Sequence, residues 1–306
     1  MTFGENLTMI IRFYTLLETS IGAISRLKSF SENVKQESSE GEDIVPPKER
    51  PADGKIDISG VSAAYEDNGE APHEHLALDN LRLSIAPGER VAICGRSGSG
   101  KSSLLLLFLR LLDPVPRPKP TGPSQDHQPS NNPLPQQIAI DSLPLTSISR
   151  NHLRARILAL PQEPVFLPSG TPTRTNLDPQ HAASESDCVS ALQAVSLWEF
   201  ISARGGLDAP LSPDTLSQGQ KQLFNLARAI LRRRLRARDS EGGILLLDMQ
   251  RVIMREFAGY TIVMVSHRLG MVMGFDRVVV MDAGRIVEMG RPAKLAETEG
   301  SKFRGL

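Results

Sequence analysis

The apolar residues of the first 30 positions recur at near-helical spacing, beginning at Leu7 and ending at Ile24. Such spacing predicts an amphipathic helix over residues 1–30, lying on its own domain or on a partner. Residues 31–54 follow with many Ser, Glu, Lys and Pro residues. This composition buries too little apolar surface to order itself, so we interpret these residues as a linker.

From Lys55 onward, short apolar segments of strand type alternate with segments of helical periodicity. A proline-rich stretch, residues 113–136, interrupts this alternation and predicts a disordered insertion or surface loop. Strands alternating with helices, after an antiparallel portion at the start, predict an α/β fold. The expected strands are 55–65, 76–85, 89–94, 137–141, 157–162, 244–248 and 261–267, then a hairpin of 277–281 and 285–289; the expected helices are 103–112, 184–204 and one running through Leu223 to Ile230.

Composition and charge narrow the class of protein. The chain has 306 residues, of which 40% are hydrophobic, enough to bury a sizeable core. Its 35 basic and 35 acidic side chains balance, which gives no reason to expect a nucleic-acid partner. The two cysteines, Cys94 and Cys188, lack metal-ligand spacing and suit a reducing compartment such as the cytosol. With no run of 18 apolar residues and no secretory signal, we expect no membrane crossing by this chain alone.

The chemistry centres on Gly95–Ser102, which matches the phosphate-binding pattern G-x-x-x-x-G-K-[ST] between an expected strand and an expected helix. Its glycines let successive N–H groups point inward at a helix N-terminus, while Lys101 reaches the β- and γ-phosphates and Ser102 completes an Mg²⁺ shell. The alternative is a plain glycine-rich turn. The expected phosphate-binding residues are Gly95, Gly98, Ser99, Gly100, Lys101, Ser102 and Ser103.

Further along the chain, Leu216–Gln220 opens a helix with Ser217 as a candidate N-cap and Gly219 open to a phosphate. Two buried strands then end in polar residues, one in Asp248 and the next in His267. Each of these features is weak evidence by itself. The arginine run of residues 232–238 is interpreted as a solvated helix end, not a nucleic-acid patch.

In this order, the motifs resemble the nucleotide-binding domain of an ATP-binding-cassette (ABC) transporter. The resemblance makes Gly95–Ser102 the Walker A loop, Leu216–Gln220 the signature, and Asp248 the Walker B aspartate. It likewise gives Gln162 as the Q-loop glutamine, His267 as the switch histidine and Tyr65 as the ring that stacks on adenine. The implied fold is that of a P-loop NTPase over residues 55–306, with a RecA-like core, an antiparallel subdomain near 55–90 and a helical subdomain near 165–235.

Finer detail resembles the second cassette of the fungal multidrug-resistance-associated (C) subfamily, carried by residues 160–164, 176–179 and 216–223. Residues 12–18 are similar to the end of the last membrane-spanning helix in that subfamily. The resemblance implies ATP and Mg²⁺ as ligands, with the metal held by Ser102, Gln162 and Asp248. It also implies that this chain works on the cytoplasmic side of a membrane as part of a transporter, although by itself it would be cytosolic. The implied partners are transmembrane domains and a second cassette, whose nucleotide site Ser217, Gly219 and Gln220 complete.

One departure from the family concerns catalysis. Met249 follows Asp248 where the family has a catalytic glutamate, so the general base is missing and Gln162 and His267 are the remaining catalytic candidates. Three interpretations stay open. The chain could couple ATP hydrolysis to export, bind nucleotide with little or no hydrolysis, or be a truncated product of a longer transporter gene.

Overall fold

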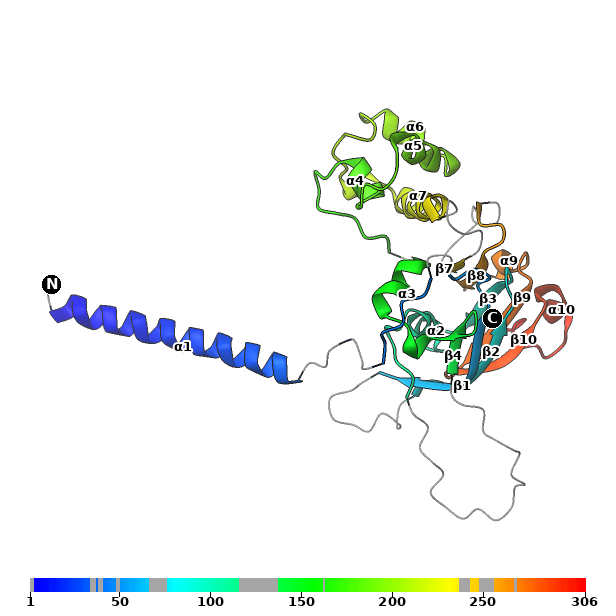
Figure 1. Cartoon of the computed structure of the whole chain (residues 1–306), viewed down its shortest axis with the longest axis horizontal. Helices are drawn as coiled ribbons and strands as arrows, with labels where there is room; N and C mark the ends of the chain where they lie inside the picture. Colours follow the sequence, from blue (N-terminus) through cyan, green and yellow to red (C-terminus); the bar gives the residue numbers. More distant parts are fainter. Residues whose placement is uncertain are drawn as a thin grey trace, which may run out of the picture. The chain divides into compact units, whose positions relative to one another are not determined.

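The computed structural model describes residues 3–33, 37, 41–47, 50–65, 76–115, 137–161, 163–236, 243–247, 256–266 and 269–306. The chain divides into two compact units, residues 1–41 and residues 42–306. The first unit carries helix α1 (Phe3–Asn33), and the second carries all the strands and the other helices (Figure 1).

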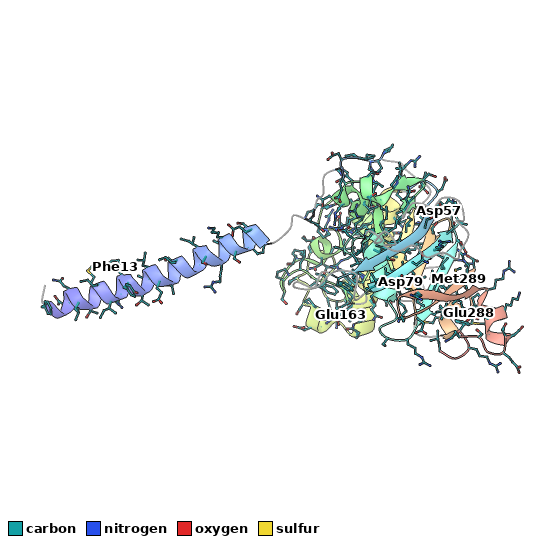
Figure 2. All side chains as sticks on the ribbon, turned by 90° about the horizontal axis from the view of Figure 1, so that it is seen from below. Phe13, Asp57, Asp79, Glu163, Glu288 and Met289 are labelled. Atoms are coloured by element: carbon teal, nitrogen blue, oxygen red, sulfur yellow. The ribbon has the colours of Figure 1, made fainter. Side chains whose placement is uncertain are left out.

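Helix α1 is 31 residues long and leaves large apolar side chains such as Ile10, Phe13 and Leu17 exposed (Figure 2). Residues 3–32 are long and apolar enough, by length and composition, to cross a membrane, with a window of mean hydropathy 1.3. The segment contains no run of 18 apolar residues, because Arg12 and Glu18 interrupt it, so the absence of a membrane crossing by this chain alone stays a prediction.

The second unit is built on a six-stranded sheet with the strand order β10-β9-β3-β8-β7-β6. Five of these strands are parallel, and β10 pairs with β9 as the antiparallel hairpin that the sequence predicts. The turn residues Ala283 and Gly284 both have positive φ angles (46° and 76°), as a two-residue hairpin turn requires. The strands are β3 (Arg90–Gly95), β6 (Ile157–Leu160), β7 (Ile244–Leu247), β8 (Thr261–Val265), β9 (Arg277–Asp282) and β10 (Arg285–Gly290).

A second, antiparallel sheet has the order β2-β1-β4-β5. Its first two strands lie where the alternating apolar pattern predicts them. With the parallel sheet it gives the mixed α/β architecture that the sequence indicates. The strands are β1 (Ile56–Ala64), β2 (Leu76–Ile85), β4 (Gln137–Ile140) and β5 (Leu143–Pro144).

The six-stranded sheet is covered on both faces, which explains its continuous apolar strands. Along β3, Val91 and Ile93 enter one core together with the antiparallel sheet and helices α2 (Lys101–Phe108) and α3 (Arg150–Arg156). Ala92 and Cys94 point to the opposite face and enter a second core with helices α5 (Glu185–Ala194) and α7 (Gln218–Arg236). Strand β3 is thus packed on both of its faces, just before the phosphate-binding loop begins.

A group of helices, drawn together in Figure 1, contributes many side chains to the second core. The helix expected over 184–204 is two helices, because α5 ends at Ala194 and Ser196 adopts a left-handed conformation (φ 57°). The helices are α4 (Thr173–Leu177), α5 (Glu185–Ala194), α6 (Trp198–Ser202) and α7 (Gln218–Arg236), with α9 (Leu269–Val272), α10 (Pro292–Glu297) and the short 3₁₀ turns η1 (Leu145–Ser147) and η2 (Pro213–Thr215) elsewhere in the unit.

Part of the expected linker is ordered on this unit. We call residues 42–47 and 50–55 the strap. Ile44 pairs with Ile148 as an isolated parallel bridge, and its N–H donates to the Ser147 carbonyl at 3.0 Å. The Asp141 carboxylate accepts the backbone N–H groups of Ala52 and Lys55 at 2.9 and 2.8 Å. The expectation that composition leaves this stretch without order was wrong for these residues, because hydrogen bonds and ion pairs replace apolar burial.

Candidate nucleotide-binding site

The loop between β3 and α2 depends on glycine for its conformation. Gly95, Gly98 and Gly100 have φ angles of 152°, 79° and 95°, a region that other residues adopt at a cost. A Cβ atom on Gly100 would also stand 2.8 Å from the Ala77 carbonyl oxygen, and one on Gly95 would collide with the Met281 carbonyl. The backbone therefore turns through a space that admits no side chain at these two positions.

Neighbouring strands brace this loop from outside. The Gly284 N–H, in the β9–β10 turn, donates to the Ser99 carbonyl at 3.1 Å, and the Asp79 N–H of β2 donates to the Gly284 carbonyl at 2.9 Å. No local pattern in the sequence marked Gly284 and Ala77 as neighbours of the site. The turn sequence Ala283-Gly284 marked a hairpin, but nothing local indicated that this hairpin meets the phosphate-binding loop.

Lys101 is buried inside the loop, with a relative exposure of 5%. Its ammonium donates to the Arg96 carbonyl at 2.7 Å and to the Ser99 hydroxyl at 3.4 Å. A buried cation is costly unless groups of opposite charge or dipole surround it, and a phosphate supplies both. The residues of the loop therefore fit a phosphate group.

The start of helix α2 adds to this fit. Its first backbone bond is from the Leu104 N–H to the Gly100 carbonyl, at 2.9 Å. The N–H groups of residues before Leu104 lie in the turn that cannot bond within the helix, where the helix dipole is positive. This arrangement is typical of an anion site at a helix N-terminus.

Cys94 comes immediately before the loop and is buried, with a relative exposure of 3%. Burial raises the pKa of its thiol to about 11, and the positive charge of Lys101 opposes this only in part. The thiol is therefore neutral at physiological pH and leaves the positive charge of the loop intact.

Tyr65 lies beside the phosphate-binding loop, as a ring for adenine would have to. It follows directly on β1, and its hydroxyl is 3.0 Å from the Oγ of Ser103 in the first turn of α2. The side chain remains half exposed, with a relative exposure of 53%. One end of the ring is therefore fixed to α2 while much of its surface stays accessible.

The signature residues form the start of α7, as the sequence predicts. Ser217 caps the helix: its hydroxyl accepts the Gln220 N–H at 3.3 Å, and the Gln220 side chain accepts the Ser217 N–H at 2.9 Å. Ser217 and Gly219 are exposed, and a Cβ on Gly219 would meet no atom within 4 Å. These side-chain bonds join residues of the signature to one another and do not involve the phosphate-binding loop.

Three predicted site residues, Gln162, Asp248 and His267, lie outside the described residues, and so does Met249. The strands that precede them, β6, β7 and β8, run parallel to β3 and end at the same edge of the sheet as the loop. Among the described residues, no group of three or more His, Cys, Asp or Glu side chains could hold a metal ion.

The fold and the loop define a P-loop nucleotide-binding α/β domain. The family described as "ABC transporter" matches residues 78–235, about half of the chain. The chain therefore belongs to the ABC transporter family and carries its nucleotide-binding, ATP-binding domain. The predicted family and fold class are both confirmed.

The similar proteins are fungal transporters of much greater length. The ABC-type transporter braE of Annulohypoxylon truncatum is 47% identical over 99% of this chain, and the ABC transporter FGM5 of Gibberella zeae is 46% identical over 100% of it. The ABC multidrug transporter B of Aspergillus fumigatus is 38% identical over 99%. This chain spans 22%, 21% and 19% of these three proteins, about a fifth of their length.

A solved structure supports the fold independently. The structure of a bacterial Atm1-family ABC exporter with ATP bound matches this chain with a TM-score of 0.72 and 21% sequence identity. The match covers 98% of this chain and 50% of the exporter chain. At this identity the likeness concerns the fold alone.

Proposed function

We propose that this chain binds ATP with Mg²⁺ and couples that binding to export across a membrane as part of a fungal ABC transporter. The observation that carries the proposal is the buried Lys101 ammonium, held by a loop that leaves no room for a side chain at Gly95 and Gly100. An ATP phosphate would replace the contacts of this ammonium with stronger ones to an anion.

The other site residues take the roles implied by the family. Ser102, Gln162 and Asp248 would hold Mg²⁺, which when bound neutralises charge on the phosphates. Tyr65 would stack on adenine, and His267 would contact the γ-phosphate. The half-exposed ring beside Ser103 supports the role of Tyr65.

The proposal includes a second nucleotide-binding domain as partner. Ser217, Gly219 and Gln220 would complete the nucleotide site of that partner. Their support is positional: the capped start of α7 is exposed, and Gly219 leaves its backbone open to an approaching phosphate.

The proposal also places the chain at the cytoplasmic side of a membrane, next to transmembrane domains. Exposed apolar side chains along α1 and its hydropathy support a position within or against a lipid bilayer. We divide the chain accordingly into a terminal membrane-associated helix over residues 1–30, a connecting segment over 31–54 and the nucleotide-binding domain over 55–306, with an insertion at 113–136 and a helical subdomain near 165–235.

A second candidate function is nucleotide binding with little or no hydrolysis. Met249 follows Asp248 directly, so this position supplies no carboxylate to activate water. Positioning ATP without an activated water leaves much of the barrier to phosphoryl transfer in place. The chain would then regulate a transporter through nucleotide occupancy.

Titration of a fluorescent ATP analogue tests the proposed function. Lys101→Ala removes a charge-assisted contact to phosphate, and such contacts contribute about 1.5–3 kcal/mol. We expect the dissociation constant to rise by a factor of about 10 to 150. Arg96→Ala is the matched control, because it removes a neighbouring side chain and leaves the Arg96 carbonyl, which accepts from Lys101, in place. Equal affinity of the unaltered chain and Lys101→Ala would contradict the proposal.

A further inference from the structure

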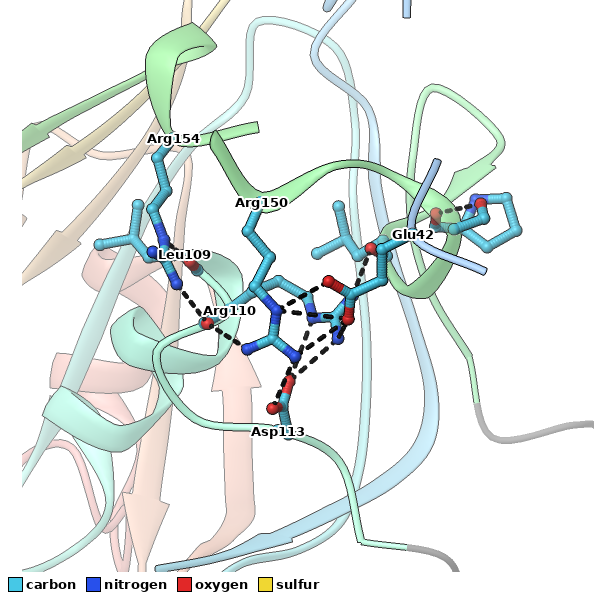
Figure 3. A network of polar contacts seen from close by, with 9 residues as sticks. Glu42, Leu109, Arg110, Asp113, Arg150 and Arg154 are labelled. Atoms are coloured by element: carbon cyan, nitrogen blue, oxygen red, sulfur yellow. Dashed lines mark hydrogen bonds and ion pairs between the residues drawn. The ribbon is translucent and has the colours of Figure 1, made fainter. Parts of the chain in front are cut away.

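A buried charge cluster joins the strap to the end of the phosphate-binding helix (Figure 3). Glu42 accepts from Arg110 at 2.7 Å, and from Arg150 at 2.9 Å through Nε and 3.0 Å through Nη2. The side chains of Glu42, Arg110 and Arg150 have relative exposures of only 4%, 5% and 7%. Glu42 thus bridges two guanidinium groups in an almost water-free position.

The cluster also fixes the backbone at the C-terminal end of α2. Arg150 and Arg154 donate to the Arg110 carbonyl at 3.2 and 2.7 Å, and Arg154 donates to the Leu109 carbonyl at 2.8 Å. Asp113 accepts from Arg110 and Arg150 at 3.1 and 2.9 Å. The carbonyls of Leu109 and Arg110, the first two residues after the helix, are therefore held by α3.

Arg110 adopts a left-handed backbone conformation, with φ of 51°. A residue with a side chain adopts this conformation at a cost, and such positions persist only where surrounding contacts determine them. At this helix end the Arg110 N–H donates to the Leu107 carbonyl at 3.1 Å and the Leu111 N–H to the Leu106 carbonyl at 2.9 Å, and these backbone bonds set the left-handed conformation. The guanidinium group of the same residue contacts Glu42, Asp113 and the Leu145 carbonyl, the last at 2.8 Å. The strap therefore supplies a carboxylate that pairs with the residue at which α2 ends.

We propose that Glu42 is a positioning residue for the phosphate-binding loop, and that docking of the strap and binding of nucleotide favour one another. The inference rests on the proposed function. Helix α2 has eight residues, so its length of about 12 Å separates the Glu42 cluster at its C-terminal end from Lys101 at its N-terminal end.

Buried ion pairs of this kind are not required for stability, since apolar residues of similar volume often serve as well. Removing one partner, however, leaves uncompensated buried charge. The strap should therefore change between docked and undocked states as a unit, which is the two-state element that coupling between two sites needs.

The first experiment uses the unaltered 306-residue chain in detergent and measures backbone hydrogen exchange with and without saturating Mg-ATP. The Ile44 and Ser149 N–H groups report on docking, because they bond to the Ser147 and Ile44 carbonyls at 3.0 and 3.1 Å. We expect ATP to slow their exchange about tenfold. An unchanged exchange rate with ATP bound would overturn the inference while leaving the proposed function intact.

The second experiment measures ATP affinity of Glu42→Gln against Glu288→Gln. Glu288 is the matched control: it accepts the Phe303 N–H at 2.9 Å and the Ser301 hydroxyl at 3.1 Å, and it lies on β10 (Figure 2). By reciprocity, Glu42→Gln should weaken ATP by up to the factor by which ATP slows strap exchange. Glu288→Gln should lower the melting temperature without changing ATP affinity, and Glu42→Asp, which keeps the charge, should recover part of the loss.

The outcomes separate the two proposals. If the unaltered chain binds no ATP, the proposed function fails and the inference fails with it. If the chain binds ATP and Glu42→Gln only lowers the melting temperature, as a merely structural residue would, the inference alone is wrong. If the Glu42→Gln variant does not fold, the hydrogen-exchange experiment on the unaltered chain still tests whether ATP binding favours docking of the strap.

Discussion

The hydroxyl of Tyr65 lies 3.0 Å from the Oγ of Ser103, so a residue at the end of the antiparallel sheet is fixed to the first turn of the phosphate-binding helix. Tyr65 follows β1, whereas Ser103 belongs to α2, two residues after Lys101. This hydrogen bond sets where one edge of the ring stands relative to the loop. A nucleotide with its phosphates at Lys101 could therefore place its base against a ring that is already positioned.

Substitutions at Tyr65 should separate stacking from positioning. Base–aromatic stacking contributes about 1–3 kcal/mol per base, so Tyr65→Ala should weaken ATP by a factor of about 5 to 150. Tyr65→Trp should largely preserve affinity, and Tyr65→Phe should lose only the part due to the hydrogen bond with Ser103. Titration with ATP and with inorganic tripolyphosphate makes the comparison. A loss of tripolyphosphate affinity in Tyr65→Ala equal to the loss of ATP affinity would contradict stacking.

The segment after Asp248 should limit ATP turnover. Replacing Met249 and the residues that follow it with a family-like segment restores a carboxylate where the general base is expected. General-base catalysis contributes about 10²–10⁴-fold, so phosphate release by the restored chain should be faster by that factor. The measurement compares the two chains at saturating Mg-ATP, with His267→Ala in each background. Equal rates, abolished by His267→Ala in the unaltered chain, would show that His267 supplies the missing function.

Gly100 should be more sensitive to substitution than Gly98. A residue with a Cβ at either position bears the cost of the left-handed conformation, about 1–2 kcal/mol. At Gly100 the new atom also stands 2.8 Å from the Ala77 carbonyl and 3.1 Å from the Leu78 side chain, whereas at Gly98 it meets nothing within 4 Å. We expect Gly100→Ala to lower the free energy of unfolding by about 1–3 kcal/mol more than Gly98→Ala in denaturant titrations. Equal losses would mean that the Ala77 backbone moves away without cost.

Cys94 should resist alkylation until the pH is very high. Burial raises its pKa to about 11, so at pH 8 only about 0.1% of this thiol is the reactive thiolate. In a Cys188→Ser background, the iodoacetamide rate of the folded chain should be more than 100-fold below that of the chain unfolded in guanidinium, and should rise about tenfold per pH unit towards pH 11. A rate that levels off near pH 8.5 would show an ordinary thiol pKa.

Local signals account for much of the fold. The strands over 76–85 and 277–281, the hairpin turn at Ala283-Gly284 and the Ser217 cap were all predicted from patterns within a few residues. Such patterns succeed because strand alternation, turn chemistry and capping depend on neighbours in the chain. The break between α5 and α6 was missed, because both halves have helical periodicity and only the conformation of Ser196 separates them.

For the proposed site, the sequence alone predicted the phosphate-binding loop: Gly95, Gly98, Gly100 and Lys101 have the spacing and the backbone freedom that are typical of an anion nest. Only the tertiary structure decided what holds that loop in place. Gly284 reaches Ser99 across 185 positions of the chain, and Glu42 lies 68 and 108 positions from its partners Arg110 and Arg150. No local pattern encodes such pairs, because charge complementarity between distant residues acts only after the order of the strands has brought them together and excluded water from between them.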